Sequence, residues 1–251
     1  MEYELASMYN LLERILDGNE EPSNLPLSLL KAITDTFSDN QLIGAGGFAK
    51  VYKGAFRNRM VAVKRLRSFP IDEKCFNKEI HCLMRSKHKN IVRFLGYCAD
   101  TQGKILIHDG KLIMAGMEER LLCFEYLQKG SLSLHITDAS QGLEWRKRYQ
   151  IIKGICQGLH YLHKENIVHL DLKPQNILLD CNMEPKIADF GLSRCFNENQ
   201  SREISTKLIG TLGYCAPELL GGEITKKSDI YSLGITIMEI LIGERHSTVE
   251  C

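Results

Sequence analysis

The chain begins with a helical pattern and changes to a strand pattern near residue 40. Residues 6–16, ASMYNLLERIL, place apolar side chains at helical spacing and predict a helix. A linker rich in Gly, Pro, Asn and Ser follows at residues 18–26, and residues 25–37 predict a short helix or an extended lead-in. We interpret residues 1–40 as an N-terminal helix-and-linker extension, which either docks a partner or packs on the following domain.

The next part of the chain is rich in strand patterns. LIGAGGFAKVYKGAF and MVAVKRL, on either side of a turn at residues 57–59, alternate β-forming residues. Residues 73–86 form a helical pattern whose apolar stripe has Glu79 beside it. Residues 91–127 predict further strands, separated by a hairpin insertion around Asp109 and Gly110.

The second half of the chain is mainly helical. Residues 143–164 carry one apolar face, and residues 228–242 predict another apolar helix after short strands and a polar loop. A strand-rich part followed by a helical part indicates an α+β domain over residues 41–251, built from two lobes. We expect a small lobe at about 41–127 and a large lobe at about 128–251.

Composition and charge exclude several classes of protein. Apolar residues make up 44% and charged residues 25%, as in ordinary soluble globular proteins. A formal net charge of +1 gives no electrostatic reason to expect a nucleic-acid partner. The longest apolar-rich stretch, IYSLGITIMEILIG, is too short and too polar to span a bilayer, and the acidic N-terminus lacks the layout of a secretory signal. We therefore expect an intracellular protein with no transmembrane segment of its own.

The nine cysteines are an odd number and are scattered without a C-x-x-C pair. A zinc site or a disulfide framework would need clustered spacing. We therefore expect buried or idle reduced thiols.

The stretch GAGGFA, residues 44–49, has the loose pattern G-x-G-x-x-[G/A]. Glycines let backbone N–H groups approach a phosphate closely, but a purely structural turn has the same pattern. A dinucleotide-binding loop would lead into a helix. Here a strand–loop–strand pattern follows, which disfavours that alternative. Lys64, in the second of these strands, is either an edge residue with its ammonium in water or a phosphate ligand held by Glu79.

Two polar motifs in the second half point to phosphoryl transfer. HLDLKPQN supplies Asp171, Lys173 and Asn176, and ADFG supplies Asp189. Transfer of a phosphoryl group needs a residue that orients the acceptor hydroxyl, a cation near the migrating group and oxygen ligands for Mg²⁺. Asp171, Lys173 and the pair Asn176 and Asp189 suit these three roles in turn.

Together these motifs resemble the eukaryotic protein kinase family from about Leu42 to Gly243. The details DLKPQNILLD, IGTLGYCAPE and SDIYSLGITIMEIL are most similar to plant receptor-like and receptor-like cytoplasmic kinases. In that group Lys173 and a threonine such as Thr211 mark serine/threonine specificity. The residues that carry the resemblance are Gly44, Gly46, Val51, Lys64, Glu79, His169, Asp171, Asn176, Asp189, Phe190, Gly191, Ala216, Pro217, Glu218 and Asp229.

The resemblance implies a bilobal α+β fold that binds ATP and Mg²⁺. It implies that Asp171 and Lys173 are catalytic and that Asn176 and Asp189 bind the metal. It also implies that Ala62 and Leu178 enclose the adenine, in front of Phe124. The ATP site would comprise Ile43, Gly44, Ala45, Gly46, Gly47, Phe48, Ala49, Lys50, Val51, Ala62, Lys64, Glu79, Glu125, Leu127 and Leu178.

Three features depart from the family pattern. Ala49 replaces the third loop glycine, and Leu170 replaces the arginine that usually precedes the catalytic Asp. That arginine pairs with a phosphate on the activation loop, so we expect the loop here to be ordered without phosphate or to be switched by a partner. The alternative is that Leu170 only fills an apolar gap and that another cation binds the phosphate. The sequence also stops at Cys251, soon after the late apolar helix. From this we expect a large lobe that lacks its last helices, and a chain that is poorly stable in isolation.

The function expected from the sequence is an ATP-dependent serine/threonine protein kinase in receptor-linked signalling. The alternative is a weakly active or inactive kinase-like fragment that binds nucleotide or a partner. The expected partners are ATP, a protein substrate and a membrane receptor or a chaperone. The expected location is the cytoplasm, with peripheral attachment to the plasma membrane through a partner.

Overall fold

The computed structural model describes residues 2–67, 73–108, 111–136, 143–197, 200–207 and 209–243. Its contacts divide the chain into two compact units. Met1–Phe76 and Arg93–Tyr126 form the first, which we call the strand-rich unit. Asn77–Val92 and Leu127–Cys251 form the second, which we call the helical unit.

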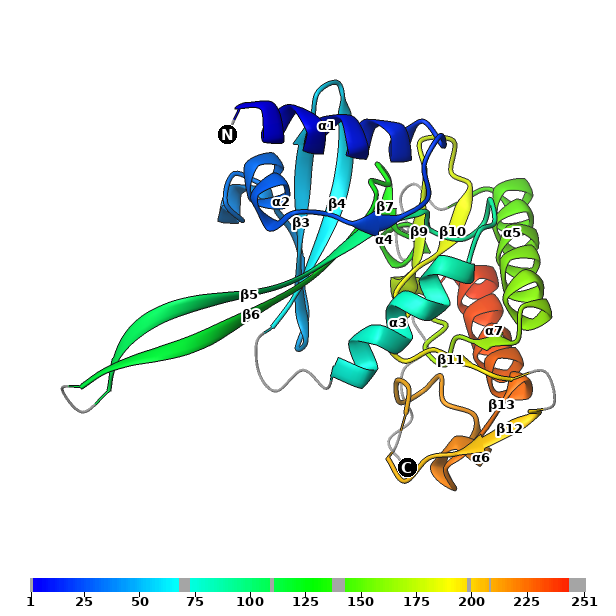
Figure 1. The fold of residues 1–251 in the computed structure, drawn as a ribbon. Helices are drawn as coiled ribbons and strands as arrows, with labels where there is room; N and C mark the ends of the chain where they lie inside the picture. The colour runs from blue at the N-terminus through cyan, green and yellow to red at the C-terminus, as the bar shows by residue number, and fades with distance from the viewer. Residues whose placement is uncertain are drawn as a thin grey trace. The chain divides into compact units, whose positions relative to one another are not determined.

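A six-stranded sheet forms the centre of the strand-rich unit, with the order β1-β5-β6-β4-β3-β2 (Figure 1). The pairings are antiparallel except that β1 runs parallel to β5. The longest hairpin, β5–β6, extends well beyond the other strands, and its predicted turn at Asp109 and Gly110 lies outside the described residues. The strands are β1 (Ser23–Asn24), β2 (Leu42–Ala45), β3 (Ala49–Phe56), β4 (Arg59–Leu66), β5 (Phe94–His108) and β6 (Lys111–Glu125).

The N-terminal residues share the core of this sheet. Helix α1 (Glu2–Leu16) and helix α2 (Leu27–Ile33) bury Leu12, Ile15 and several leucines of α2 in one apolar cluster with sheet residues such as Phe56. The guanidinium of Arg93 donates to the carbonyl oxygens of Ile15 and Leu16 at the end of α1, where the last carbonyls of a helix have no i+4 backbone donor within the helix. The extension therefore packs on the sheet, and a short 3₁₀ turn, η1 (Asp39–Gln41), leads from it into β2.

The helical unit is built around α5 (Trp145–Lys164) and α7 (Lys226–Ile242), with short strands and turns between them. Three small sheets have the orders β10-β9-β7, β11-β8 and β12-β13. Its other elements are α4 (Ser133–Ile136), α6 (Pro217–Leu220), η2 (Pro174–Asn176), β7 (Gly130–Ser131), β8 (Ile167–Val168), β9 (Ile177–Leu179), β10 (Pro185–Ile187), β11 (Arg194–Cys195), β12 (Arg202–Ile204), β13 (Glu223–Thr225) and most of α3 (Glu73–Arg85).

Helix α5 approaches β10 closely because two of its residues have no side chain. A Cβ on Gly154 would lie 2.5 Å from the Cγ of Pro185, and a Cβ on Gly158 would lie 2.7 Å from the carbonyl oxygen of Asn90. Distances this short are not tolerated in close-packed interiors. The close approach fixes β10, from which the chain runs directly to Asp189.

Helix α7 begins with a reciprocal cap and ends at a glycine. The Thr225 hydroxyl accepts from the backbone N–H of Lys227, the Ser228 hydroxyl lies 3.4 Å from the Thr225 backbone nitrogen, and Gly243 has a left-handed φ of 82°. One side of α7 is buried, and the exposed large apolar side chains lie on other sides. These side chains are Ile230, Tyr231, Met238, Leu241 and Ile242.

The structure corrects the expectation that the cysteines are all reduced, because it contains a disulfide between Cys82 and Cys195. The two residues are 113 positions apart, so sequence spacing alone does not pair them. The remaining described cysteines are not in disulfides. None of the helices in the described part of the chain combines the length and the apolar character of a membrane-spanning segment.

We expect the substitution Leu12→Ala to lower the free energy of unfolding by about 2–5 kcal/mol, because it opens a cavity in the core of the sheet. The measurement is chemical denaturation beside the wild type. Asn10→Ala, at an exposed position of the same helix, is the control and should change the stability little. Equal stability of Leu12→Ala and wild type would show that α1 does not contribute to the core.

Candidate active site

A buried carboxylate on α7 positions the loop that leads to Asp171. Both oxygens of Asp229 accept from the loop backbone: Oδ2 from the N–H of His169 at 2.8 Å and Oδ1 from the N–H of Leu170 at 2.7 Å. His163 of α5 bonds to the same carboxylate through Nε2 at 2.9 Å. Asp229 is fully buried, and Leu170 has a left-handed φ of 68°. A leucine in this conformation is strained, so these bonds stabilise a geometry that the sequence disfavours.

Four polar side chains meet at the end of this loop. The ammonium of Lys173 lies 2.8 Å from Asp171 Oδ2 and donates to Thr211 Oγ1 at 2.6 Å. The Thr211 hydroxyl in turn donates to Asp171 Oδ1 at 2.6 Å. Asn176 donates its amide to Asp171 Oδ2 and to the Asp171 carbonyl, each at 2.8 Å. The structure thus brings the predicted Asp171, Lys173 and Asn176 together, and adds Thr211 from the chain segment beyond β12.

Asp189 reaches the same unit through β10. Its φ of 65° turns the chain sharply after Ala188, and the following Phe190 is buried with its ring edge-on to His169 at 5.2 Å between centroids. The ring nitrogen Nε2 of His169 lies 3.0 Å from the carbonyl oxygen of Ala188. His169 thus joins the backbone of the Asp171 loop to the backbone that precedes Asp189.

The donor set suits Mg²⁺ better than a transition metal. The Asn176 amide nitrogen is used by Asp171, which leaves the side-chain carbonyl oxygen for a cation. The backbone carbonyl of Asn176 accepts from the N–H of Ala188 at 2.8 Å, so Asp189 follows directly after a residue bonded to Asn176. Mg²⁺ is commonly held by one or two protein oxygens together with substrate phosphates. Across the described part of the chain, no group of three or more His, Cys, Asp or Glu side chains could hold a metal by itself.

The predicted phosphate loop lies in the strand-rich unit, between β2 and β3. Gly46 N–H donates to the carbonyl of Ala49 at 2.9 Å, which closes the turn, and Phe48 at its tip is 91% exposed. A Cβ on Gly47 would meet nothing within 4 Å, and one on Gly46 would approach only the Ala49 carbonyl. The loop is therefore open to a ligand. Lys50 forms a long ion pair with Asp39, at 3.8 Å.

The other predicted ATP-site residues divide between the two units. On the sheet, Lys64 of β4 lies opposite Val51 of β3, and Ala62 lies opposite Lys53. Glu125 closes β6, where its carboxylate accepts from the Arg93 N–H at 2.8 Å. The helical unit contains Leu127 and the buried Glu79, and it also contains Leu178 of β9, which pairs with Ser131. Both Lys64 and Glu79 have interaction partners.

Leu170 is 3% exposed and packs in an apolar cluster. The cluster includes Phe196, Ile209 and Ile224, so it joins the Asp171 loop to the segment from Leu192 to Cys215, which we call the loop segment. Within that segment β12 pairs with β13, and Arg194 lies 3.5 Å from the carboxylate of Glu203. Apolar packing and a carboxylate thus hold the described part of the loop segment.

Sequence reasoning missed two contributors to the site. His163 lies within the helical pattern of residues 143–164, and nothing in that pattern distinguishes it from its neighbours. Its role follows only from the structure, where it bonds to the carboxylate of Asp229. Cys215 lies near Asp171 and Lys173, and burial, followed by the nearby Asp171 charge, raises the pKa of its thiol, which lowers the thiolate fraction near neutral pH.

Comparison with known proteins matches residues 37–249 to the protein kinase domain. The chain belongs to the protein kinase domain family. It is 40% identical over 237 residues to the G-type lectin S-receptor-like serine/threonine-protein kinase RKS1 of Arabidopsis thaliana. The aligned region covers 91% of this chain and 26% of that relative. It is 39% identical over 231 residues to the cysteine-rich receptor-like protein kinase 6 of Oryza sativa subsp. japonica. Here the aligned region covers 89% of this chain and 31% of that relative. The chain thus spans about a third or less of the length of these relatives. The match confirms the predicted α+β protein kinase fold.

We expect Asp229→Asn to lower the free energy of unfolding by about 1–3 kcal/mol, because one carboxylate oxygen is replaced by an amide that faces a buried donor. Thermal or chemical unfolding measures the change. The matched control is Asp180→Asn, since Asp180 also accepts from two backbone N–H groups but is partly exposed. If both variants lose the same small amount, the Asp229 carboxylate does not hold the loop as described.

Proposed function

We propose that the chain transfers the γ-phosphate of ATP to serine and threonine hydroxyls of a protein substrate, with Mg²⁺ as cofactor. The observation that carries the proposal is the hydrogen-bonded group of Asp171, Lys173, Asn176 and Thr211. Membership of the protein kinase family and relatives named as serine/threonine-protein kinases support it.

Each side chain has a chemical role in this proposal. Asp171 accepts a hydrogen bond from the substrate hydroxyl and orients its oxygen toward the γ-phosphorus, and Lys173 offsets the negative charge that develops during transfer. Bound Mg²⁺ neutralises phosphate charge, and Asn176 and Asp189 would hold it. Lys64, on β4 of the strand-rich unit, would bind the phosphates through its ammonium.

The proposed choice of hydroxyl rests on Thr211. In the structure its aliphatic hydroxyl already donates to Asp171 Oδ1 at 2.6 Å while it accepts from Lys173. A serine or threonine of a substrate presents the same short hydroxyl to the same carboxylate. The compact spacing of Lys173, Thr211 and Asp171 therefore suits a small side chain better than the longer reach of a tyrosine.

A signalling role is proposed from the relatives, whose names describe receptor-like kinases. The competing proposal is a kinase-like binding module with little turnover. The exposed apolar side chains of α7 favour that alternative, because such patches mark interaction surfaces. A radiolabelled autophosphorylation assay on the purified chain, with Asp171→Asn as the control, separates the two.

We expect Lys64→Met and Asp189→Asn each to abolish phosphoryl transfer and to leave the fold intact, because each removes charge that opposes phosphate or metal. Turnover measured beside circular dichroism gives the two readouts. Lys153→Met, at an exposed position of α5, and Asp180→Asn are the matched controls and should keep turnover near the wild-type value. Near-normal turnover in either test variant would show that its assigned role is wrong.

We also expect the loop segment to need no phosphate for basal activity. Ser201 and Thr206 are exposed, and the Ser205 hydroxyl donates to the Lys207 carbonyl, while Leu170 offers no cation to a phosphate. Replacing Ser201, Ser205 and Thr206 together with alanine should therefore reduce turnover by less than about tenfold, which corresponds to about 1.4 kcal/mol.

The positive control for this triple variant is Thr211→Ala, which removes the hydroxyl between Lys173 and Asp171 and should reduce turnover strongly. A loss of about a hundredfold or more in the triple variant, restored by acidic replacements, would contradict this account of Leu170.

A further inference from the structure

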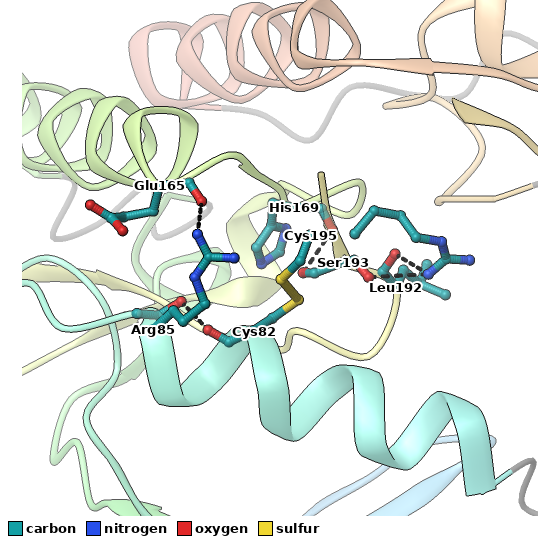
Figure 2. The surroundings of a disulfide bond; sticks show 9 residues. Cys82, Arg85, Glu165, His169, Leu192, Ser193 and Cys195 are labelled. Carbon is teal, nitrogen blue, oxygen red and sulfur yellow. Dashed lines mark hydrogen bonds between the residues drawn. A yellow bond between two sulfur atoms is a disulfide. The ribbon is translucent and has the colours of Figure 1, made fainter. Parts of the chain in front are cut away.

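The disulfide joins two segments that border the candidate active site. Cys82 lies on α3 and Cys195 lies on β11, with their Cα atoms 6.1 Å apart, within the usual range of about 4.4–6.8 Å (Figure 2). Both residues belong to the helical unit. The bond therefore connects parts of one compact body across 113 residues of sequence.

Each cysteine is close in sequence to a residue with a proposed role in phosphoryl transfer. Cys82 follows Glu79 by three positions, so the two residues are neighbours along one side of α3. Cys195 follows Asp189 by six positions, in the segment that leaves Asp189-Phe190-Gly191. A bond between them restricts the helix that carries Glu79 and the segment that carries Asp189 at the same time.

Both ends of the bond are anchored locally, as Figure 2 shows for the α3 side. Arg85 donates to the Glu165 carbonyl at 2.7 Å, and the Ser86 hydroxyl donates to the Cys82 carbonyl at 2.7 Å. On the other side, β11 pairs with β8, and Cys195 lies opposite Ile167. Since β8 leads into the Asp171 loop, the disulfide links α3 to the backbone of the candidate active site.

We propose that Cys82 and Cys195 form a site of reversible oxidation, for which a hydroperoxide is the oxidant and a protein or small-molecule dithiol is the reductant. In reducing compartments, disulfides are mostly transient bonds that respond to oxidants. The oxidised form holds α3 against the β11–β8 pair, and reduction releases it.

The oxidation balances as a two-step reaction with hydrogen peroxide. The Cys195 thiolate attacks one peroxide oxygen, the O–O bond breaks, and hydroxide leaves as Cys195 becomes a sulfenic acid. The Cys82 thiolate then attacks that sulfur, the S–S bond forms, and a second hydroxide leaves. Two protons from the thiols convert both hydroxides to water, and the sulfurs lose two electrons to the peroxide.

The order of attack follows from exposure. Cys195 is partly exposed, whereas Cys82 is 1% exposed. An oxidant therefore meets Cys195 first, and Cys82 acts as the resolving thiol. One thiolate of the dithiol attacks the Cys195 sulfur, forms a mixed disulfide and releases the Cys82 thiol. The second thiol of the reductant then displaces Cys195 as a thiol, and the reductant leaves as its own disulfide.

Four other described cysteines are poor competitors for the oxidant. Burial raises the pKa of Cys98 to about 12 and the pKa of Cys123 to about 12. Burial also raises the pKa of Cys156 and of Cys215. Little thiolate forms at these sites near neutral pH. Cys181 is exposed and outside any disulfide, and it provides a matched control.

The test uses the full chain, first reduced by a dithiol and then treated with hydrogen peroxide. Free thiols are blocked, and peptides are mapped by mass spectrometry without reduction. We expect a Cys82–Cys195 linked peptide in the wild type and in Cys181→Ser, and none in Cys82→Ala or Cys195→Ser. Cys195→Ser changes a partly exposed residue, so it keeps the test valid if the buried Cys82→Ala variant does not fold.

The conformational consequence is tested by hydrogen exchange on the same samples. Amides of residues 77–85 should exchange about tenfold more slowly in the oxidised than in the reduced wild type, and Cys195→Ser should show no difference. Peroxide that yields no linked peptide, a bond that a dithiol does not reduce, or equal exchange in the two forms would each overturn the proposal.

The effect on catalysis rests on the proposed function. The group of Asp171, Lys173, Asn176 and Thr211 is hydrogen-bonded in the disulfide form, so the oxidised chain should be at least as active as the reduced chain. A linked peptide and slowed exchange in a chain without turnover would leave the redox site standing and reject the kinase proposal. Turnover lost on oxidation in the wild type but not in Cys195→Ser would overturn the stated direction of control.

Discussion

The fully buried carboxylate of Asp229 is the interaction on which the candidate active site depends. It accepts from the backbone of His169 and Leu170 and bonds to His163, so one side chain fixes the end of α5, the start of α7 and the loop between them. A buried charge is tolerated only where hydrogen bonds replace its hydration. Because Leu170 is held in a left-handed conformation, Asp171 is presented to Lys173, Thr211 and Asn176 from a rigid base.

The loop segment shows how a family departure can be accommodated by packing. Leu170 occupies the position where an arginine is usual, and it lies in an apolar cluster with Phe196 and Ile209 of the loop segment. Burial of apolar surface is not directional and needs no covalent modification. The pairing of β12 with β13 and the approach of Arg194 to Glu203 add polar restraints. Apolar packing, strand pairing and this ion pair therefore hold the described part of the loop segment.

Much of the fold follows from local sequence patterns. The strand–loop–strand around GAGGFA, the helix over residues 73–86 and the face of α5 were all predicted from periodicity, because burial repeats with the period of the element. Asp171, Lys173 and Asn176 were selected from one short motif by the chemistry of phosphoryl transfer, and hydrogen bonds and an ion pair join them in the structure. Asp229 and His163 are 66 positions apart in the sequence, and Cys82 and Cys195 are 113 positions apart. Periodicity and spacing within a short stretch do not predict contacts between residues so far apart.

The packing of α1 on the sheet has a consequence for where the folding unit begins. The family match starts at residue 37, but the apolar core of the sheet already includes Leu12, Ile15 and Leu25. The apolar core of the strand-rich unit therefore begins before the first residue of the family match. A fragment trimmed to the family boundary would present a bare apolar sheet face to water, next to the strands that carry the glycine loop. Poor expression of the shorter fragment would then reflect the loss of core side chains and not a property of the kinase domain.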